Sequence, residues 1–260
     1  MKVVILAGGL GSRISEESHL KPKPMIEIGE VPILCHIMKT YSHYGFNDFV
    51  ICAGYKQHVI KKYFADYYLR HSDVTFDFSG GADKVIVHNT KTENWKVTIV
   101  DTGLHTLTGG RVRRIQKYIN DDEFMLTYGD AVSDVDILKL LEHHRNSGKL
   151  ATLTAVQPGG RFGTLDIGQD SVVNNFAEKT KESGGWINAG FMILNRRIFD
   201  LISSDQTILE REPLETLSRE GQLSAYKHTG FWQCMDTLKE KNYLENLWDS
   251  GMAPWKVWEE

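Results

Sequence analysis

The chain opens with a short apolar run that stops at two glycines. Residues Val3–Ala7 are apolar at every position, and Gly8 and Gly9 follow directly. A strand that is buried on both faces, as in a parallel sheet, has this continuous apolar pattern. Because parallel strands need crossover connections, which usually cover the faces of the sheet, the opening run already favours an α/β fold.

Later segments repeat this strand pattern and alternate with helices. Apolar runs at 49–53, 124–128 and 150–155 predict further buried strands. Apolar residues recur with helical spacing over 33–44 and again over 59–68. The alternation predicts an α/β fold with a Rossmann-like, mostly parallel mixed sheet that is flanked by helices.

Local signals also place three helices in the rest of the chain. One is expected over 112–118, and Asp134 is a candidate cap for the helix that contains Ile137. A helical pattern over 238–248 follows Asp236, which is a residue type that favours the capping position as well.

The pattern changes after residue 155. Short strand-like pieces at 164–167, 172–176 and 191–194 are separated by polar and glycine-rich turns. We interpret this half as strands added to the sheet plus a smaller substrate-binding lobe. No repeat or low-complexity linker divides the chain, so residues 1–260 are expected to form a single domain.

Composition excludes several classes of protein. Hydrophobic residues make up 41% and charged residues 25%, the balance of a globular domain and not of a disordered chain. The net charge of −4, with no dense Lys/Arg run, argues against nucleic-acid binding. Three widely separated cysteines do not suggest disulfides, and no apolar run suits a membrane span or signal peptide, so a cytoplasmic location is expected.

The glycine loop after the first strand is suited to binding phosphate. Residues 6–13 read Leu-Ala-Gly-Gly-Leu-Gly-Ser-Arg. Glycines let backbone amides approach a ligand closely, and consecutive amides form a concave site for phosphate oxygens. Arg13 adds a guanidinium that can bind phosphate through two hydrogen bonds.

Three kinds of phosphate loop compete for this segment. A dinucleotide fingerprint fits only in its first half, because position 14 is Ile, and no P-loop string occurs. The third kind is a glycine loop followed by a basic residue and a lysine that is stiffened by prolines, here Lys21-Pro22-Lys23-Pro24. A plain strand-to-helix turn is the structural alternative to all three.

The third reading leads to a family resemblance. Residues 6–13 followed by 21–24 resemble the signature of the sugar-nucleotide pyrophosphorylase family of nucleotidyltransferases. Further family-like segments run along the chain: Tyr128-Gly129-Asp130, Phe162-Gly163, Glu178-Lys179, Asn188-Ala189-Gly190 and Phe231-Trp232-x-x-Met235-Asp236-Thr237. Segments 109–111, 158–163 and 253–258 look like the cytidylyltransferase branch, which joins CTP to glucose 1-phosphate.

The resemblance implies a metal-dependent displacement. A sugar-phosphate oxygen attacks the α-phosphorus of the nucleotide and pyrophosphate leaves, so the protein must align two anions and neutralise their charge. Residues 1–155 are then the nucleotide-binding half, and 156–260 the sugar-phosphate-binding half with a C-terminal tail. By the same resemblance Asp130 and Asp236 share one Mg²⁺, although a turn role for Asp130 and a capping role for Asp236 stay open.

The resemblance also assigns the charged residues that contact the substrates. Arg13 is expected to bind the leaving pyrophosphate and Lys23 the reacting phosphate, while Lys21 serves as a solvated comparison within the same cluster. Lys179 is expected to bind the sugar phosphate, and Glu178 the sugar hydroxyls. A Glu-Lys pair is otherwise ordinary surface charge, so these two roles depend on the resemblance.

The same family resemblance implies the remaining site residues. Arg111 and Thr108 are expected to read the base, with a glycine turn carrying an exposed arginine as the alternative. Gly163 and Asn188 are candidate sugar contacts. The nucleotide-binding set is Leu6, Ala7, Gly8, Gly9, Leu10, Gly11, Ser12, Arg13, Lys23, Thr108, Arg111, Tyr128 and Gly129.

Two departures from the family pattern leave the substrate open. Thr180 stands where a proline usually follows the Glu-Lys pair, and Ala131 stands where a glycine usually follows the metal-binding aspartate. UTP or dTTP in place of CTP, another sugar 1-phosphate, and a non-catalytic nucleotide-sugar binding protein therefore remain alternatives. Relatives of this branch form homo-oligomers, and the tryptophan-rich tail at 248–258 is expected to pack either at a subunit interface or on its own core.

Overall fold

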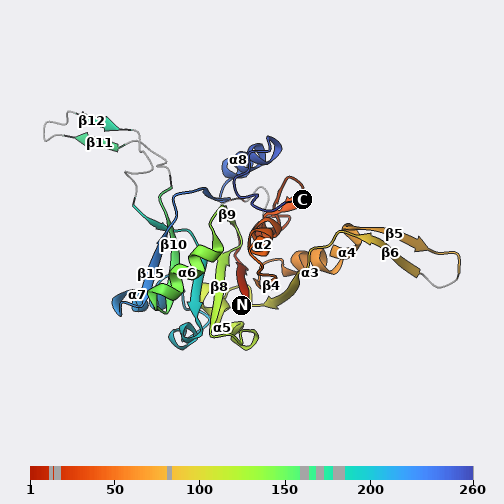
Figure 1. The fold of residues 1–260 in the computed structure, drawn as a ribbon, viewed down its shortest axis with the longest axis horizontal. Helices are drawn as coiled ribbons and strands as arrows, with labels where there is room; N and C mark the ends of the chain where they lie inside the picture. The colour runs from red at the N-terminus through yellow and green to blue at the C-terminus, as the bar shows by residue number, and fades with distance from the viewer. Residues whose placement is uncertain are drawn as a thin grey trace.

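The chain folds around a central eight-stranded sheet in this computed structural model (Figure 1). The structure describes residues 1–11, 14, 19–80, 84–158, 164–167, 173–177 and 185–259. Along the sheet the strand order is β13-β10-β14-β8-β1-β4-β7, and β15 pairs with β10. The strands are β1 Val3–Ala7, β4 Asp48–Ala53, β7 Lys96–Asp101, β8 Glu123–Tyr128, β10 Ala151–Val156, β13 Ile187–Asn188, β14 Met192–Asn195 and β15 Leu223–Lys227.

The sheet is parallel on one side and mixed on the other. Strands β8, β1, β4 and β7 run parallel to one another. Strand β14 lies antiparallel to both β8 and β10, whereas β15 is parallel to β10. The predicted Rossmann-like mixed sheet is therefore confirmed, and the added strands of the second half extend its antiparallel side.

The continuous apolar run of β1 reflects two separate cores. Val3, Ile5 and Ala7 belong to one buried cluster, whereas Val4 and Leu6 belong to the other. Successive side chains of a strand point to opposite faces, so both faces of this strand are covered. This double burial is what the opening sequence pattern predicts.

Helices cover both faces of the sheet. Residues of α2, α3, α6 and α8 contribute to the first core, and residues of α5, η5 and α7 to the second. The helices are α2 Ile33–His43, α3 Gln57–Ala65, α4 Tyr67–Arg70, α5 Thr108–Arg114, α6 Ile137–Ser147, α7 Glu212–Arg219 and α8 Leu238–Asp249, with 3-10 turns η2 Lys23–Met25, η3 Gln116–Tyr118 and η5 Arg196–Leu201. Across the described ranges, none of these helices is both long and apolar enough to cross a bilayer.

Two predicted helix boundaries are wrong. The helix expected over 112–118 begins four residues earlier, at Thr108, and its last residues form the separate turn η3. Asp134 does not cap α6: Asp136 accepts the Lys139 N–H at 3.0 Å instead. Asp134 accepts the backbone N–H of Phe231 at 2.7 Å, a contact nearly a hundred residues away along the chain that local pattern does not reveal.

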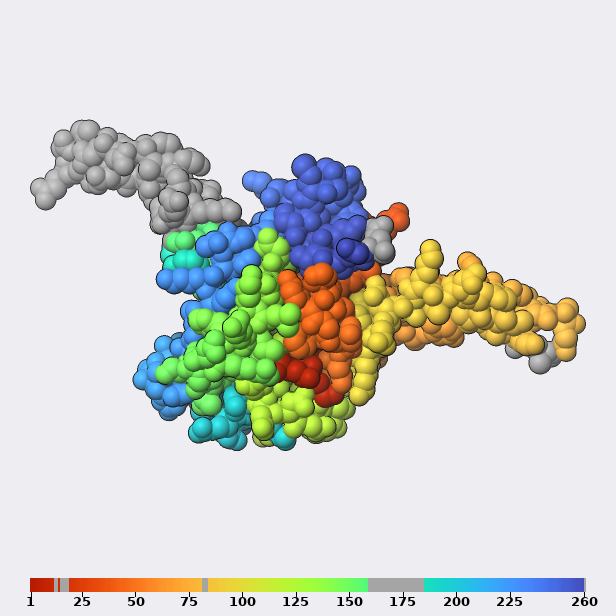
Figure 2. Space-filling view, in the orientation of Figure 1, coloured from red at the N-terminus to blue at the C-terminus, as the bar shows by residue number. Residues whose placement is uncertain are grey.

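Four shorter two-stranded sheets lie outside the main sheet. Strand β5 (Ser72–Asp77) pairs with β6 (Lys84–Thr90) in a hairpin that projects far from the body (Figures 1 and 2). A second hairpin joins β11 (Thr164–Ile167) to β12 (Val173–Ala177). The other two pairs are β2 (Glu27–Ile28) with β3 (Val31–Pro32), and β9 (Ala131–Ser133) with β16 (Trp232–Cys234).

The tryptophan-rich tail folds back on its own core. The C-terminal end lies beside α2 in Figure 1, and Trp255 is fully buried. Its indole N–H donates to Nδ1 of His36 at 3.3 Å, while Nε2 of His36 lies 2.8 Å from the Ile28 carbonyl. A carbonyl only accepts, so Nε2 carries the ring hydrogen. Burial lowers the pKa of His36 to about 4, which keeps this ring neutral at pH 7.

Candidate active site

A cavity of about 390 Å³ lies where β1 and β8 end. The carboxyl ends of parallel strands are where α/β folds place their ligands. Every described residue of the predicted nucleotide-binding set lines this cavity except Leu10, whose side chain is 55% exposed. The lining residues are Leu6, Ala7, Gly8, Gly9, Gly11, Ile14, Lys23, Pro24, Thr106, Leu107, Thr108, Arg111, Tyr128, Gly129 and Asp130.

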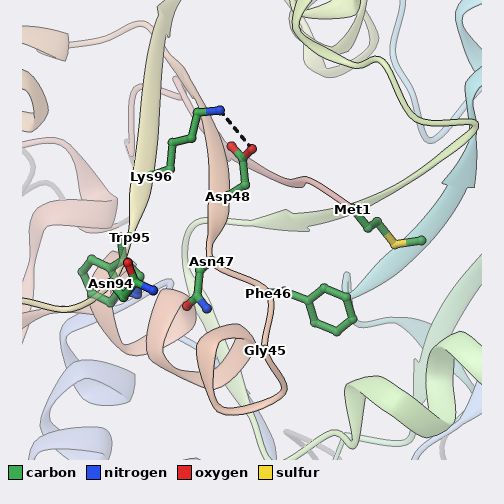
Figure 3. A pocket seen from close by; sticks show the side chains of 8 residues that line it. All are labelled: Met1, Gly45, Phe46, Asn47, Asp48, Asn94, Trp95 and Lys96. Atoms are coloured by element: carbon green, nitrogen blue, oxygen red, sulfur yellow. Dashed lines mark ion pairs between the residues drawn. The ribbon is translucent and has the colours of Figure 1, made fainter.

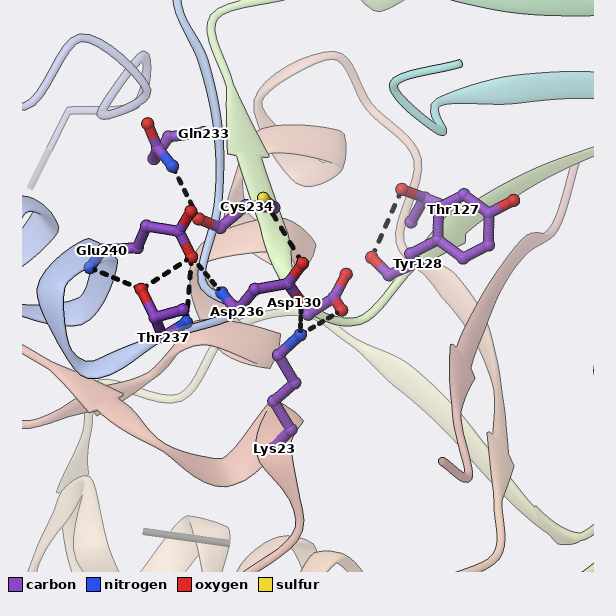
Figure 4. Close-up of polar contacts among 9 residues, drawn as sticks. All are labelled: Lys23, Thr127, Tyr128, Asp130, Gln233, Cys234, Asp236, Thr237 and Glu240. Carbon is purple, nitrogen blue, oxygen red and sulfur yellow. Dashed lines mark hydrogen bonds and ion pairs between the residues drawn. The ribbon is translucent and has the colours of Figure 1, made fainter. Parts of the chain in front are cut away.

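Lys23 lies at one end of the cavity between two carboxylates (Figure 4). Its Nζ contacts Oδ2 of Asp130 at 2.6 Å and also pairs with Oδ1 of Asp236. Lys23 and Asp236 are each only 9% exposed. Burial alone lowers the pKa of Lys23, but the two carboxylates outweigh it and raise the pKa above its usual value. The lysine therefore stays charged and forms an ion pair with each of the two aspartates.

A short antiparallel pair of strands brings the two aspartates together. Asp130 directly precedes β9, and Asp236 follows β16 after Met235. In the register of these strands Ala131 lies opposite Cys234, and the Met235 N–H donates to the Asp130 carbonyl at 2.8 Å. The distance between the carboxylates is thus fixed by strand pairing between two distant parts of the sequence.

The capping alternative for Asp236 is wrong. Helix α8 is capped by Thr237, whose hydroxyl accepts the Glu240 N–H, while the Glu240 carboxylate accepts the Thr237 N–H at 2.9 Å. This reciprocal arrangement satisfies the start of the helix without the side chain of Asp236. Its carboxylate is therefore left to face Lys23.

A Ser-His-Asp group beside the site braces a turn. Nε2 of His228 lies 2.8 Å from Asp134 and 3.3 Å from the Ser133 hydroxyl, so both partners meet the same ring nitrogen. A nucleophilic triad needs the serine and the acid on opposite nitrogens. Ser133 also donates to the Phe231 carbonyl at 2.7 Å. These contacts hold the turn that leads into β16, and hence the position of Asp236.

The two aspartates suit a hard divalent cation. Both carboxylates converge on one positive charge, the ammonium of Lys23, at the edge of the cavity. Mg²⁺ usually takes one or two carboxylates and completes its shell with substrate phosphates and water. Among the residues that the structure describes, no cluster of three or more His, Cys, Asp or Glu side chains offers a complete protein-built metal site. The donor set therefore fits a metal that arrives with phosphate.

Arg111 also lines the cavity, and its side chain is buried. Its guanidinium donates to the Gly8 carbonyl at 2.9 Å, the Gly103 carbonyl at 2.8 Å, the Thr102 hydroxyl at 2.7 Å and the Leu104 carbonyl at 3.3 Å. The alternative of an exposed arginine on a glycine turn is wrong, because the residue is 5% exposed within α5. Base reading by Arg111 stays a prediction, and most of its donors already bind the protein.

Gly8 leaves room for this arginine. A Cβ at this position would lie 2.0 Å from Nη1 of Arg111, a distance that no real Cβ contact shows. The glycine of the loop thus serves the packing of the guanidinium against the backbone, in addition to any role in binding phosphate. Sequence reasoning names only the second purpose.

Glu210 is a site residue that sequence reasoning missed. Its carboxylate accepts hydrogen bonds from the hydroxyls of Thr108 and Tyr128, each at 2.6 Å. Tyr128 in turn accepts from Nδ2 of Asn188 at 3.3 Å, which links a predicted sugar contact to the nucleotide cavity. No local signal marks Glu210, because it sits in an ordinary charged stretch, Glu210-Arg211-Glu212.

The glycines of α5 are explained by the segment that carries Glu210. Gly109 donates its N–H to the Thr207 carbonyl at 3.0 Å. A Cβ at Gly110 would lie 2.3 Å from the Asp205 carbonyl oxygen. The segment 205–210 therefore packs directly on the first turn of α5.

Five predicted site residues lie outside the described residues: Ser12, Arg13, Gly163, Glu178 and Lys179.

A second cavity, of about 450 Å³, lies at the opposite edge of the sheet, where β4 and β7 begin (Figure 3). Met1, Phe46 and Trp95 contribute to its lining, together with residues that begin the strands. Its Asp48 is already paired with Lys2 at 2.9 Å and with Lys96 at 3.4 Å. This edge has neither the glycine loop nor the paired aspartates, so we place the chemistry in the first cavity.

The chain is similar to known proteins over nearly its whole length. A family model described as "Nucleotidyl transferase" matches residues 2–233. The chain is 56% identical to a glucose-1-phosphate cytidylyltransferase of Salmonella typhi over 260 residues, which is 100% of both chains. It is 42% identical to a probable glucose-1-phosphate cytidylyltransferase of Bacillus subtilis, covering 99% of this chain and 100% of that one. The crystal structure of HddC from Yersinia pseudotuberculosis matches with a TM-score of 0.68 at 25% identity, covering 95% and 99% of the two chains.

Proposed function

Because the chain belongs to the nucleotidyl transferase family, we propose that it joins CTP to glucose 1-phosphate and releases CDP-glucose and pyrophosphate. The full-length likeness to glucose-1-phosphate cytidylyltransferases supports both substrates. The observation that carries the chemistry is the position of Lys23, which lies at the end of a glycine-lined cavity between two carboxylates. A reaction that consumes a nucleoside triphosphate suits the cytoplasm, and we propose that location.

The reaction is a displacement at phosphorus. A phosphate oxygen of glucose 1-phosphate attacks the α-phosphorus of CTP, and the bond from that phosphorus to the β-phosphate oxygen breaks. Because both reactants are anions, the protein acts mainly by holding them in line and by neutralising charge. Lys23 remains an ammonium in this environment and is positioned to stabilise the negative charge that builds up on the reacting phosphate.

The two aspartates provide the second source of charge control. We propose that Asp130 and Asp236 bind Mg²⁺, which when bound supplies positive charge to the phosphate oxygens. The convergence of both carboxylates on a single cation position supports this assignment. Without the metal, Lys23 offsets one of the two negative charges and pairs with both aspartates.

The remaining roles are proposed from the family likeness. Arg13 binds the leaving pyrophosphate, Lys179 the sugar phosphate, and Glu178 and Gly163 the sugar. Asn188 is the described member of this group, and its amide lies 3.3 Å from the Tyr128 hydroxyl at the border of the nucleotide cavity.

We propose that the chain forms a homo-oligomer through the β5–β6 hairpin. Val74 lies opposite Val87, and Phe76 opposite Val85, which makes one face of the hairpin apolar. The side chain of Phe76 is 53% exposed and that of Phe78 is 72% exposed, and their rings stack. An isolated two-stranded hairpin is barely stable in water, so a second copy covering this face gives the arm its support.

The activity is tested by pyrophosphate release. Purified protein with Mg²⁺, CTP and glucose 1-phosphate is expected to release pyrophosphate and to form CDP-glucose, identified by mass spectrometry. Asp130→Asn, which keeps the size of the side chain, is expected to lower the rate by at least about a hundredfold. Binding of both substrates without turnover would favour the alternative of a non-catalytic nucleotide-sugar binding protein.

A further inference from the structure

Glu210 sits behind the base end of the nucleotide cavity. Lys23 and Asp130 line the part of the cavity where the phosphates are proposed to bind, and Thr108, which is predicted to read the base, lines the cavity as well. In Figure 4 the Tyr128 ring points away from the Lys23 cluster. Tyr128 and Thr108 both line the cavity, whereas Glu210 contacts their hydroxyls without being part of the lining.

The carboxylate fixes the direction of both hydroxyl hydrogens. An ionised carboxylate can only accept, so the hydroxyls of Thr108 and Tyr128 must donate to Glu210. Neither hydroxyl then has a hydrogen left to offer to a ligand.

The hydroxyls of Thr108 and Tyr128 can instead accept hydrogen bonds from a ligand through their oxygen atoms. A hydroxyl has two acceptor positions besides its hydrogen. Thr108 uses one of them for the Leu209 N–H at 3.0 Å, and Tyr128 uses one for the amide of Asn188. The hydroxyls of Thr108 and Tyr128 therefore present acceptor oxygens, and no hydrogens, to the cavity.

We infer that Glu210 is a positioning residue for base selection. By taking the hydrogens of the Thr108 and Tyr128 hydroxyls, it leaves these two groups as hydrogen-bond acceptors, which favour a base edge that carries an amine. Cytosine has an amino group where uracil and thymine have a carbonyl oxygen. The two hydroxyl oxygens can accept a hydrogen bond from that amine. A carbonyl oxygen at the same position would face another acceptor, so uracil and thymine would lose this hydrogen bond. The inference rests on the proposed function, because it assumes that a pyrimidine nucleotide occupies the cavity.

The test is Glu210→Gln, assayed with CTP and with UTP. The amide of glutamine donates to one of the two hydroxyls, so that hydroxyl turns its hydrogen toward the cavity. We expect the ratio of kcat/KM for CTP to kcat/KM for UTP to fall by about tenfold. Glu212→Gln is the matched control, because Glu212 is an exposed residue at the start of α7, and it is expected to keep the wild-type ratio.

A purely structural role for Glu210 gives a different result. In that case kcat/KM for CTP and UTP fall together and the ratio is unchanged, which overturns the inference. If Glu210→Gln does not fold, Thr108→Val makes the same test, since it removes the acceptor oxygen at constant shape: a fall in the ratio supports the inference, and a constant ratio overturns it. A wild-type protein that lacks any preference for CTP contradicts the proposed function itself.

Discussion

The two ends of the nucleotide cavity are built on opposite principles. At the phosphate end, Lys23 and two aspartates face one another as charges that a charged substrate and a metal can engage. At the base end, Arg111 and Glu210 satisfy their hydrogen bonds with the protein and hold the wall in place. The contrast supports the proposal that the phosphate end does the chemistry, which all nucleotides share, and that the base end selects among nucleotides.

The largest effect is expected at the phosphate end. Lys23→Ala removes the ammonium beside the reacting phosphate and is expected to lower kcat/KM by about a thousandfold, for CTP and UTP alike. The control is Lys21→Ala in the same proline-flanked cluster, since Lys21 pairs with Glu27 at the surface at 3.0 Å. Steady-state kinetics check both variants, and a comparable loss in the two would show that the cluster acts as diffuse charge.

A middle-sized effect is expected at the base end. Arg111→Lys cannot replace the hydrogen bonds to the Gly8, Gly103 and Leu104 carbonyls, and is expected to lower the free energy of unfolding by about 2 kcal/mol. Urea denaturation measures this loss. A variant of wild-type stability that has lost affinity for CTP alone would instead make Arg111 a base-reading residue, and would break the contrast between the two ends.

The smallest effect lies outside both ends, in the tail. His36 has a pKa of about 4 in the folded protein, below its ordinary value of 6.5, so the unfolded chain binds a proton first as the pH falls. Stability is therefore complete above about pH 6.5 and declines toward pH 4, by about 1 kcal/mol at pH 5.5. Urea denaturation of the wild type and of His36→Asn at pH 7.5 and 5.5 measures how much of the loss in the free energy of unfolding is due to His36. Equal losses in the two proteins would exclude His36 as the cause.

The sequence predicts those parts of the fold that depend on local sequence pattern. The buried strands β1, β4 and β8 carry continuous apolar runs, and each ends where the cavity or its loops begin. The wrong boundaries, at α5 and α6, lie where distant segments decide the outcome. A helix that starts at Thr108-Gly109-Gly110 contradicts helix propensity, and it forms because the segment 205–210 packs on it.

The candidate site divides in the same way. The approach of Asp130 to Asp236 was expected from family resemblance only, since the strand pairing that produces it joins distant parts of the chain. Glu210 carries no sequence signal, because a glutamate that is followed by two other charged residues looks like solvated surface. Its partners Thr108 and Tyr128 come from two other elements, and only the fold shows that their hydroxyls meet one carboxylate.

One competition experiment tests the central claim most directly. Wild-type protein is incubated with Mg²⁺, glucose 1-phosphate and an equal mixture of CTP, UTP, dTTP and ATP, and the nucleotide sugars are separated and identified by mass spectrometry. The proposed function predicts that CDP-glucose is the dominant product. A dominant product with another base, or no nucleotide sugar from any of the four, would contradict it.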